Sequence, residues 1–269
     1  METRTFPNCL VAVTTETRKC SGSRFPTENT AIGENMQQSG ALDKNSIYET
    51  LRKRICLLDY VPGTSLNERL LADEFSVSRT PMRAVLQRLE YDGLISSQHG
   101  RGTIVTSIDL EQMRGIYALR IKLTEAIADA PARIISDEVR AELEHLEGDI
   151  KSLLEMPAEG ASLLGKSEKR AFGEISIRIH EVLQSLTDNE TLRDFSDVLF
   201  YQSARYWFLL LSHFDWKSET REMLDEVRLL KNCILLGDIQ AAALSRKLHL
   251  ALVLSRIAHI ESFPEIAEE

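Results

Sequence analysis

The sequence lacks the marks of a secreted, membrane-spanning or zinc-binding protein. Its four cysteines, Cys9, Cys20, Cys56 and Cys233, show no CxxC spacing, which fits a reducing cytoplasm and argues against a zinc finger. No apolar run approaches the roughly 18 residues of a membrane-spanning helix. The apolar stretch at residues 9–13 is too short for a secretory signal and has no basic flank. We therefore predict a cytoplasmic protein without a membrane partner, in which Cys56 and Cys233 are ordinary core thiols.

The chain also lacks the positive charge expected of a nucleic-acid-binding protein, because its net charge is −9. This charge is unevenly distributed. Residues 1–40 hold four basic and four acidic side chains, residues 41–107 hold nine and eight, and residues 108–269 hold 19 and 29. DNA contacts one face of a protein, so the charge of that face matters more than the net charge of the whole chain. Residues 41–107 therefore remain a candidate DNA-binding domain. Residues 1–40, polar and without periodicity, are predicted to be a flexible tail, and residues 108–269 a separate domain.

Two short helical patterns lie between Ser65 and Arg83, in the stretch SLNERLLADEFSVSRTPMR. The predicted inward positions are Leu66, Leu70, Leu71 and Phe75 in the first pattern, and Val85, Leu86 and Leu89 in the second. Ser78 is a good N-cap for the second helix, and Pro81 is tolerated in its first turn. The polar residues left at this helix start are Ser78, Arg79, Thr80 and Arg83. Hydroxyls and guanidiniums at a helix N-terminus suit phosphates and guanine edges, so the layout predicts a helix-turn-helix.

A helix and a hairpin flank this unit. Residues 46–58 have an apolar stripe at helical spacing, and Gly93 is a natural left-handed cap for the recognition helix. Two β-prone runs, residues 94–98 and 103–106, then enclose a turn that contains His99, Gly100 and Arg101. We interpret this hairpin as a wing whose polar tip enters a minor groove. The alternative is an ordinary hairpin with an exposed arginine.

Everything after residue 107 has helical periodicity. The predicted helices cover residues 109–135, 137–156, 168–186, 190–212, 218–236 and 239–261. Pro131 should bend or shorten the first of them. The predicted fold is therefore mainly α: a winged helix-turn-helix of three helices and a β-hairpin, followed by an all-α antiparallel bundle. The apolar runs at 198–211 and 248–260 exceed what one buried face needs, which favours packing of part of them in a homodimer.

The N-terminal motifs resemble a known family. The segments IYETLRKRI, VPGTSLNERLLADEFSVSRTPMRAVLQRLEYDGLI and HGRGTIV, within residues 47–105, resemble the winged-helix domain of GntR-family bacterial transcription regulators. One departure is Ser76, where the family usually has glycine. The resemblance implies that Arg69 contacts phosphate or base and that the recognition-helix residues named above lie in the major groove. It places His99 and Gly100 at the wing.

The C-terminal half is similar to the FadR-like branch of that family, with its FCD ligand-binding domain. Tyr117-Ala-Leu-Arg120 resembles a first-helix motif whose arginine faces the effector cavity. Residues 172–189 resemble the helix that supplies metal ligands, with His180 in the ligand position. Leu248-His249 resembles the last helix and its ligand histidine.

The resemblance also implies a divalent metal, which the residues of this chain disfavour. Ser176 occupies the position of the family's carboxylate ligand, and Val227 occupies another ligand position, so only His180 and His249 remain. Two histidines make a weak metal site. Three other side chains stay open as substitute ligands: His145, Glu174 and His213. No cofactor is predicted with certainty.

The sequence therefore predicts a dimeric regulator that binds double-stranded operator DNA and responds to a small effector, an organic acid. Arg120 would clamp the acid's carboxylate, with His180 and His249 as further donors. A structural ion pair between helices is the competing role for Arg120. A larger or acyl-type ligand and an effector-independent, architectural DNA binder remain open. An enzyme that uses the two histidines is disfavoured, since no nucleophile–base pair or phosphate loop accompanies them.

Overall fold

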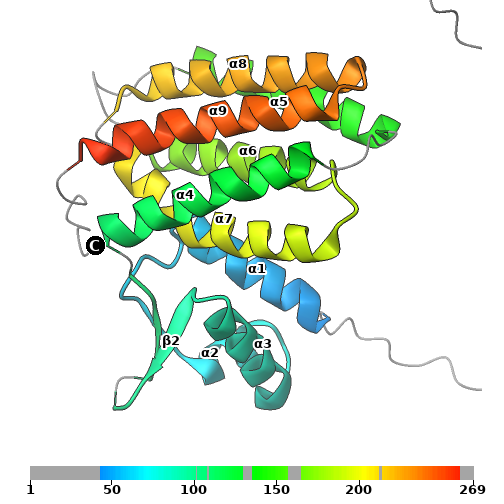
Figure 1. The fold of residues 1–269 in the computed structure, drawn as a ribbon. Coiled ribbons are helices and arrows are strands. Elements are labelled where there is room, and N and C mark those ends of the chain that lie inside the picture. Colours follow the sequence, from blue (N-terminus) through cyan, green and yellow to red (C-terminus); the bar gives the residue numbers. More distant parts are fainter. Residues whose placement is uncertain are drawn as a thin grey trace, which may run out of the picture. The chain divides into compact units, whose positions relative to one another are not determined.

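Short helices and strands form the N-terminal part of the described chain, and long helices follow them (Figure 1). The computed structural model describes residues 43–100, 102–107, 109–129, 135–156, 165–211 and 214–260. The first elements are α1 (Lys44–Cys56), β1 (Ser65–Leu66), α2 (Glu68–Glu74), α3 (Arg79–Tyr91), β2 (Ile95–Gln98) and β3 (Gly102–Val105). The helices that follow are α4 (Leu110–Ala128), α5 (Asp137–Glu155), α6 (Lys166–Gln184), α7 (Glu190–Leu210), α8 (Trp216–Leu235) and α9 (Ile239–Ala258).

The N-terminal elements form a winged helix-turn-helix, as predicted. Its antiparallel sheet has the order β1-β3-β2, with Ile95 opposite Val105. The apolar stripe of α1 and the inner face of α3 are buried together, and Gly93 ends α3 with the left-handed φ of 72° that was expected. Cys56 is buried in this core, and Cys233 is buried in α8.

The predicted start of the first helical pattern, which forms α2, was wrong. Ser65 and Leu66 form β1, which pairs with β3, and α2 begins only after Asn67. The Asn67 side chain accepts hydrogen bonds from the backbone N–H groups of Arg69 and Leu70, at 2.9 and 3.1 Å, and so fixes the helix start. Leu70, which was expected to face inward, is 58% exposed on α2.

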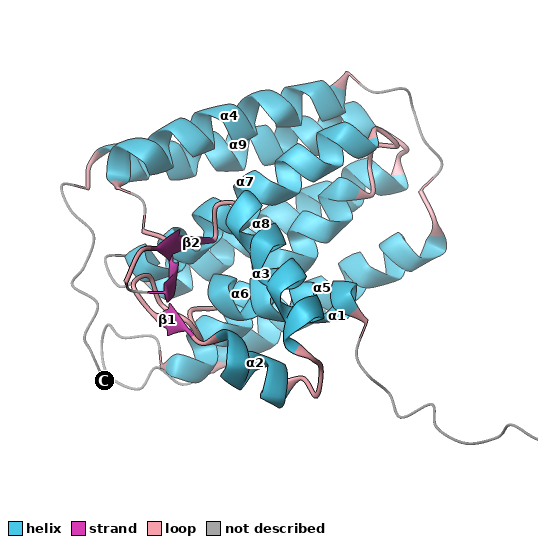
Figure 2. Cartoon of the chain, turned by 90° about the horizontal axis from the view of Figure 1, so that it is seen from below, coloured by secondary structure: helices cyan, strands magenta, loops and turns pink. Residues whose placement is uncertain are grey.

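Six helices follow in the described part, close to the predicted bounds. The prediction for the first was too long, because α4 ends at Ala128 with Asp129 as its C-cap, ahead of Pro131, which lies outside the described residues. Helix α4 packs along α9, and α5 packs on α6 and α8 (Figure 2). None of the described helices is both long and apolar enough to cross a bilayer.

Helix α7 has a special position, since it packs on α1 as well as on α4 and α6 (Figure 1). Its aromatic and aliphatic side chains are buried on more than one side. The apolar run at residues 198–211, which favoured a dimer contact, is thus accounted for mainly by packing within this chain.

Candidate DNA-binding face and effector cavity

The predicted DNA-contacting side chains that the structure describes belong to α2, to α3 and the residue before it, and to the turn between β2 and β3. Arg69, Ser78, Arg79, Thr80, Arg83, His99 and Gly100 are all exposed. The last two lie between β2 and β3, at the hairpin turn, where Gly100 has a φ of 79°. Arg101 lies outside the described residues. Ser78 is the N-cap residue of α3, and its side chain makes no capping hydrogen bond.

The arginines of this face differ in their partners. Arg83 donates from Nε and Nη2 to the two carboxylate oxygens of Glu68, at 3.2 and 3.1 Å. Neither Arg69 nor Arg79 forms an ion pair with any residue that the structure describes. The contact with Glu68 was not predicted, because the two partners lie 15 residues apart on different helices.

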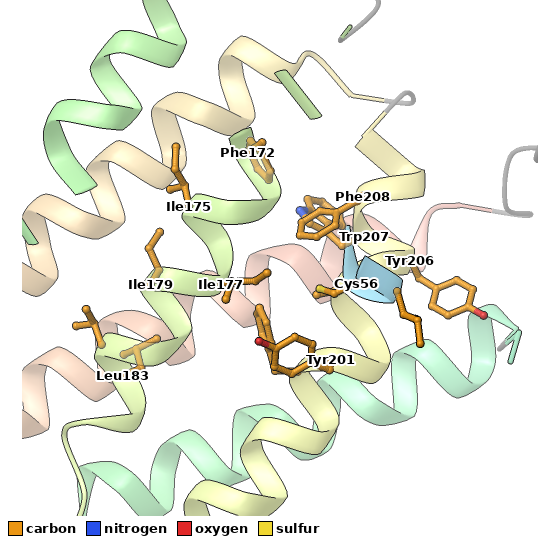
Figure 3. Packing of buried hydrophobic residues seen from close by; sticks show 14 of the residues in the cluster. Cys56, Phe172, Ile175, Ile177, Ile179, Leu183, Tyr201, Tyr206, Trp207 and Phe208 are labelled. Carbon is orange, nitrogen blue, oxygen red and sulfur yellow. The ribbon is translucent and has the colours of Figure 1, made fainter. Parts of the chain in front are cut away.

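The helical half encloses two adjoining cavities, of about 40 and 20 Å³. They share Arg120 on α4 and Arg246 and Leu250 on α9 as lining residues. The larger cavity has an aromatic wall: Tyr117, Phe172, Phe200, Trp207 and Phe208. Figure 3 shows three of these rings, those of Phe172, Trp207 and Phe208, gathered between α6 and α7. His249 lines the larger cavity, His180 lines the smaller one and Arg120 lines both, so the three predicted effector residues lie on the walls of two adjoining cavities.

Arg120 is a buried cation without a carboxylate. It is only 6% exposed, and its Nη1 donates to Ser203 Oγ of α7 at 3.0 Å. Burial lowers its pKa to about 10, while the nearby Tyr117 acts in the opposite direction. Among the described residues it forms no ion pair, and hence the predicted alternative of a helix–helix ion pair is not found.

Arg246 was not predicted, although it lies three residues before His249. Its Nη1 donates to Glu226 Oε1 at 2.8 Å, and His249 Nδ1 lies 3.4 Å from Glu226 Oε2. Burial alone would raise the pKa of Glu226, but the charge of Arg246 brings it below its ordinary value. Burial lowers the pKa of His249 to about 4, so this imidazole is neutral at physiological pH. Glu226 directly precedes Val227, the position at which a family ligand was expected.

His180 belongs to a second polar chain, which runs toward the winged helix. Its Nε2 lies 3.0 Å from Asp197 Oδ1 on α7, and Asp197 Oδ2 accepts a hydrogen bond from Arg52 of α1. The imidazole stacks on Phe200 with a centroid separation of 4.0 Å. Burial lowers the pKa of His180 to about 4, despite the carboxylate beside it.

The residues present do not fit the divalent metal that the family resemblance implies. Ser176 donates its hydroxyl to the Phe172 carbonyl at 2.9 Å, and Val227 is an apolar core residue. His180 and His249 contact different carboxylates. Across the described ranges, no three His, Cys, Asp or Glu side chains gather as metal ligands. Of the substitutes, His145 is exposed, Glu174 pairs with Arg170 at 3.2 Å, and His213 lies outside the described residues.

Helix α7 also binds the winged helix directly, through contacts that sequence analysis missed. Gln202 Nε2 donates to the Asp92 carbonyl at 2.7 Å, and Arg205 Nη2 donates to Thr106 Oγ1 at 2.7 Å. A Cβ atom at Gly93 would lie 2.9 Å from Gln202 Nε2, so the glycine permits this close approach. One helix therefore lines the cavity and holds the end of the recognition helix.

Comparison with known proteins agrees with this geometry. Residues 43–105 match the family model of bacterial regulatory proteins of the gntR family, and residues 115–252 match the FCD domain. An uncharacterized HTH-type transcriptional regulator of Bacillus subtilis, YdhC, is 28% identical over 55% of this chain and 62% of its own length. The HTH-type transcriptional repressor RspR of Escherichia coli is 34% identical over 36% of this chain and 43% of its own. This chain thus spans less than two thirds of either relative, and both are named as regulators rather than enzymes.

Solved structures share the fold. Escherichia coli McbR/YncC has a TM-score of 0.64 at 16% identity, covering 80% of this chain and 96% of its own. A putative GntR transcriptional regulator from Rhodococcus sp. RHA1 has a TM-score of 0.61 at 18% identity, covering 80% and 97%.

Proposed function

This chain belongs to the GntR family of bacterial regulatory proteins and carries an FCD domain, and we propose that it is a transcription regulator whose operator binding responds to an anionic effector. The observation that carries the effector part is Arg120: a buried guanidinium on a cavity wall, without a carboxylate partner among the described residues. An isolated buried charge is costly, and an anion in the cavity would compensate it. Arg120 would bind that anion, with His180 and His249 bordering the same region.

DNA binding would use the exposed face of α2, α3 and the wing. Arg79 is exposed at the N-terminus of α3 and has no competing ion pair in the described chain, so it can donate both to phosphate and to a base edge. Arg79→Ala should weaken binding by roughly 1–3 kcal/mol. The measurement is fluorescence anisotropy with a duplex that the full chain selects from a randomised library.

Arg140 is a matched control, because it is an exposed arginine on α5. Arg140→Ala should bind the selected duplex as well as the parent does. If Arg79→Ala also binds at parental strength, the role of α3 as the recognition helix is wrong.

The proposed route from cavity to DNA is helix α7. Phe200, Ala204 and Trp207 line the larger cavity, while Asp197, Gln202 and Arg205 of the same helix bind the winged helix. A cavity of about 40 Å³ holds a few water molecules at most, so an organic effector must displace its walls. A displacement of α7 would change the placement of the winged helix and favour one of two arrangements.

The effector is tested by screening organic acids for a rise in melting temperature, followed by anisotropy with the selected duplex. A ligand of the native state raises the melting temperature by mass action. An active acid should also shift operator affinity in the parent, and Arg120→Gln should keep DNA binding but lose this response. An unchanged operator affinity with every bound acid would leave an effector-independent DNA binder as the correct description.

A homodimer is the proposed assembly, with α9 as the contacting helix. Leu244, Leu248 and Leu252 are 45%, 59% and 49% exposed and recur every four residues, so they form an apolar stripe on one side of α9. Leu248→Glu should convert the dimer to a monomer in light scattering. Leu229→Glu, at an exposed leucine of α8, is the control and should remain dimeric.

A further inference from the structure

Helix α7 supplies hydrogen-bond donors to the end of the recognition helix. Asp92 is the C-cap residue of α3, and its carbonyl accepts from Gln202 Nε2 at 2.7 Å. The Leu94 carbonyl, two residues further on, accepts from Arg205 Nη1 at 3.3 Å. Carbonyl groups at a helix C-terminus have no partner within the helix and are satisfied by other groups. Two side chains of α7 therefore complete the C-terminal end of α3.

Thr106 is the residue through which α7 also reaches the wing. It directly follows β3, and its Oγ1 donates to the Gly93 carbonyl at 2.6 Å and accepts from Arg205 Nη2 at 2.7 Å. Its backbone N–H donates to the Leu94 carbonyl at 3.0 Å, and its own carbonyl accepts from the Tyr206 hydroxyl at 3.0 Å. A single guanidinium, that of Arg205, thus joins the end of α3 to the end of β3.

Packing alone does not explain why an arginine stands at this position. Arg205 is fully buried, and it has no carboxylate partner in the described chain. Burial of an unpaired cation is costly, and an apolar residue of similar volume often gives equal or greater stability. The guanidinium adds direction, because its planar set of donors fixes the positions of its two acceptors relative to each other.

A second contact on the same helix prevents the winged helix from turning about the first. Arg52 of α1 donates to Asp197 of α7. Asp197 lies eight residues before Arg205, which corresponds to about 12 Å along a helix. Because the two contacts are this far apart, the winged helix cannot pivot about either of them while the other is kept. Its placement on α7 is therefore fixed as long as both contacts are present.

We propose that Arg205 and Thr106 are positioning residues that set the spacing between the two DNA half-sites that the protein accepts. The inference rests on the proposed function, since it requires two winged helices of a homodimer on one operator. With each winged helix fixed on its own α7, the two recognition helices present one separation and one relative rotation. An inserted base pair moves a half-site by about 3.4 Å and rotates it by about 35°. The complex can follow that change only by deforming the DNA or by breaking the contacts of Arg205.

The test compares the selected duplex with two versions of it, in which one base pair is added or removed midway between the half-sites. Fluorescence anisotropy with the full chain gives the dissociation constants. The parent should bind the altered duplexes at least about tenfold more weakly, since adjustment to them breaks charge-assisted hydrogen bonds. Thr106→Val removes the hydroxyl that joins Arg205 to Gly93, and Arg205→Met removes the guanidinium. In both variants the penalty for altered spacing should fall to about threefold or less.

A matched control separates positioning from stability. Thr220 is fully buried on α8, and its hydroxyl donates to the Trp216 carbonyl of the same helix at 2.7 Å. Thr220→Val should destabilise the protein but keep the parental penalty for altered spacing. The ratio of dissociation constants is the readout, because a loss of folded protein weakens the binding of every duplex alike. A control variant that also loses the penalty would overturn the inference, since destabilisation in general would then relax the spacing.

Failure of this inference is distinguishable from failure of the proposed function. If the parent binds all three duplexes equally, the protein binds DNA but its winged helices are not held at one spacing, and the inference is wrong. It is equally wrong if Thr106→Val and Arg205→Met keep the full parental penalty. If the full chain selects no duplex from the library, the proposed function is wrong and the inference fails with it.

Discussion

The two halves of the molecule use arginine in opposite environments. Arg69, Arg79 and Arg83 of the winged helix are exposed, whereas Arg120 and Arg246 of the helical half are buried at the cavity wall. A surface guanidinium remains hydrated and can exchange water for phosphate at little cost. A buried one has lost its hydration and needs an anion or several acceptors nearby. Arginine therefore indicates a polyanion at the surface of the winged helix and a small anion in the cavity of the helical half.

Burial alone does not identify a ligand-binding arginine. Arg205 is fully buried, and it donates to Thr106 Oγ1 and to the Leu94 carbonyl, but it borders neither cavity. Arg52 is buried against Asp197 and joins α1 to α7. These two arginines hold the halves together. What distinguishes Arg120 is its place on the walls of both cavities, with the hydroxyl groups of Ser203 and Tyr117 rather than a carboxylate as its described hydrogen-bond partners.

The largest expected effect comes from breaking the buried pair between the halves. Asp197→Ala removes the carboxylate that faces both Arg52 and His180, and leaves the buried Arg52 with the half-exposed Glu49 as its remaining acidic partner among the described residues. The free energy of unfolding should fall by about 3 kcal/mol or more. Urea denaturation followed by circular dichroism measures it.

The matched control is the exposed pair of the winged helix. Glu68→Ala removes the partner of Arg83, whose side chain is 65% exposed, and should cost less than about 1 kcal/mol. If both variants lost the same free energy of unfolding, burial would not determine how much an ion pair stabilises this protein, and the contrast between the two halves would be wrong.

The next effect depends on pH and tests the neutral state of His180. Its pKa is about 4 in the folded protein and about 6.5 when unfolded, so the unfolded chain binds more protons between these values. Stability should therefore be complete above pH 6.5 and should decrease as the pH falls, by about 2 kcal/mol between pH 7.5 and pH 5 from this group. The charged groups that face it are Asp197, Arg120 and Arg246.

His180→Gln isolates that contribution. Urea denaturation of parent and variant at pH 7.5 and pH 5 should show a smaller pH-dependent loss in the variant. The difference between them removes opposing titrations, such as that of Glu219, whose pKa burial raises to about 7. If parent and variant lost the same stability between pH 7.5 and pH 5, a group other than His180 would account for the pH dependence.

The winged helix was largely predictable because its signals are local. The capping position of Ser78, the left-handed Gly93 and the alternation around Gly100 each lie within a few residues of the element that they define. The error at Ser65 and Leu66 arose from a partner strand almost 40 residues later, since only pairing with β3 makes them a strand. Long-range pairing is what periodicity cannot detect.

The cavity was predicted only in part, for the same physical reason. Arg120, His180 and His249 came from resemblance, and the structure places them on the walls of two adjoining cavities. Arg246, Glu226 and Asp197 were missed because their meaning depends on neighbours from other helices. Charged residues on amphipathic helices normally face solvent. Only the packing of α4, α8 and α9 shows that Arg246 and Glu226 are buried.

A smaller effect is expected at the turn before α3. Ser76 follows the end of α2 with a φ of 54°, a left-handed conformation that glycine adopts at Gly93 and Gly237. Ser76→Gly should stabilise the protein by roughly 0.5–1 kcal/mol, because a side chain is strained there. Thermal denaturation measures the gain. Gly93→Ala is the reverse test and should destabilise the protein, since the added Cβ atom would also crowd Gln202. A loss of stability in Ser76→Gly would show that the serine side chain contributes more to stability than its backbone strain costs.

The smallest effect concerns DNA affinity at the exposed pair. Glu68 occupies the Nε/Nη2 edge of Arg83 and adds a negative charge beside the face that would meet phosphate. Glu68→Ala should free Arg83 and strengthen binding of the selected duplex by about two- to fivefold, corresponding to under about 1 kcal/mol. The gain should shrink at higher salt, because it comes from phosphate contacts. Weaker binding would instead mean that Glu68 holds Arg83 in the orientation that reads DNA, and that an exposed arginine too depends on its carboxylate partner.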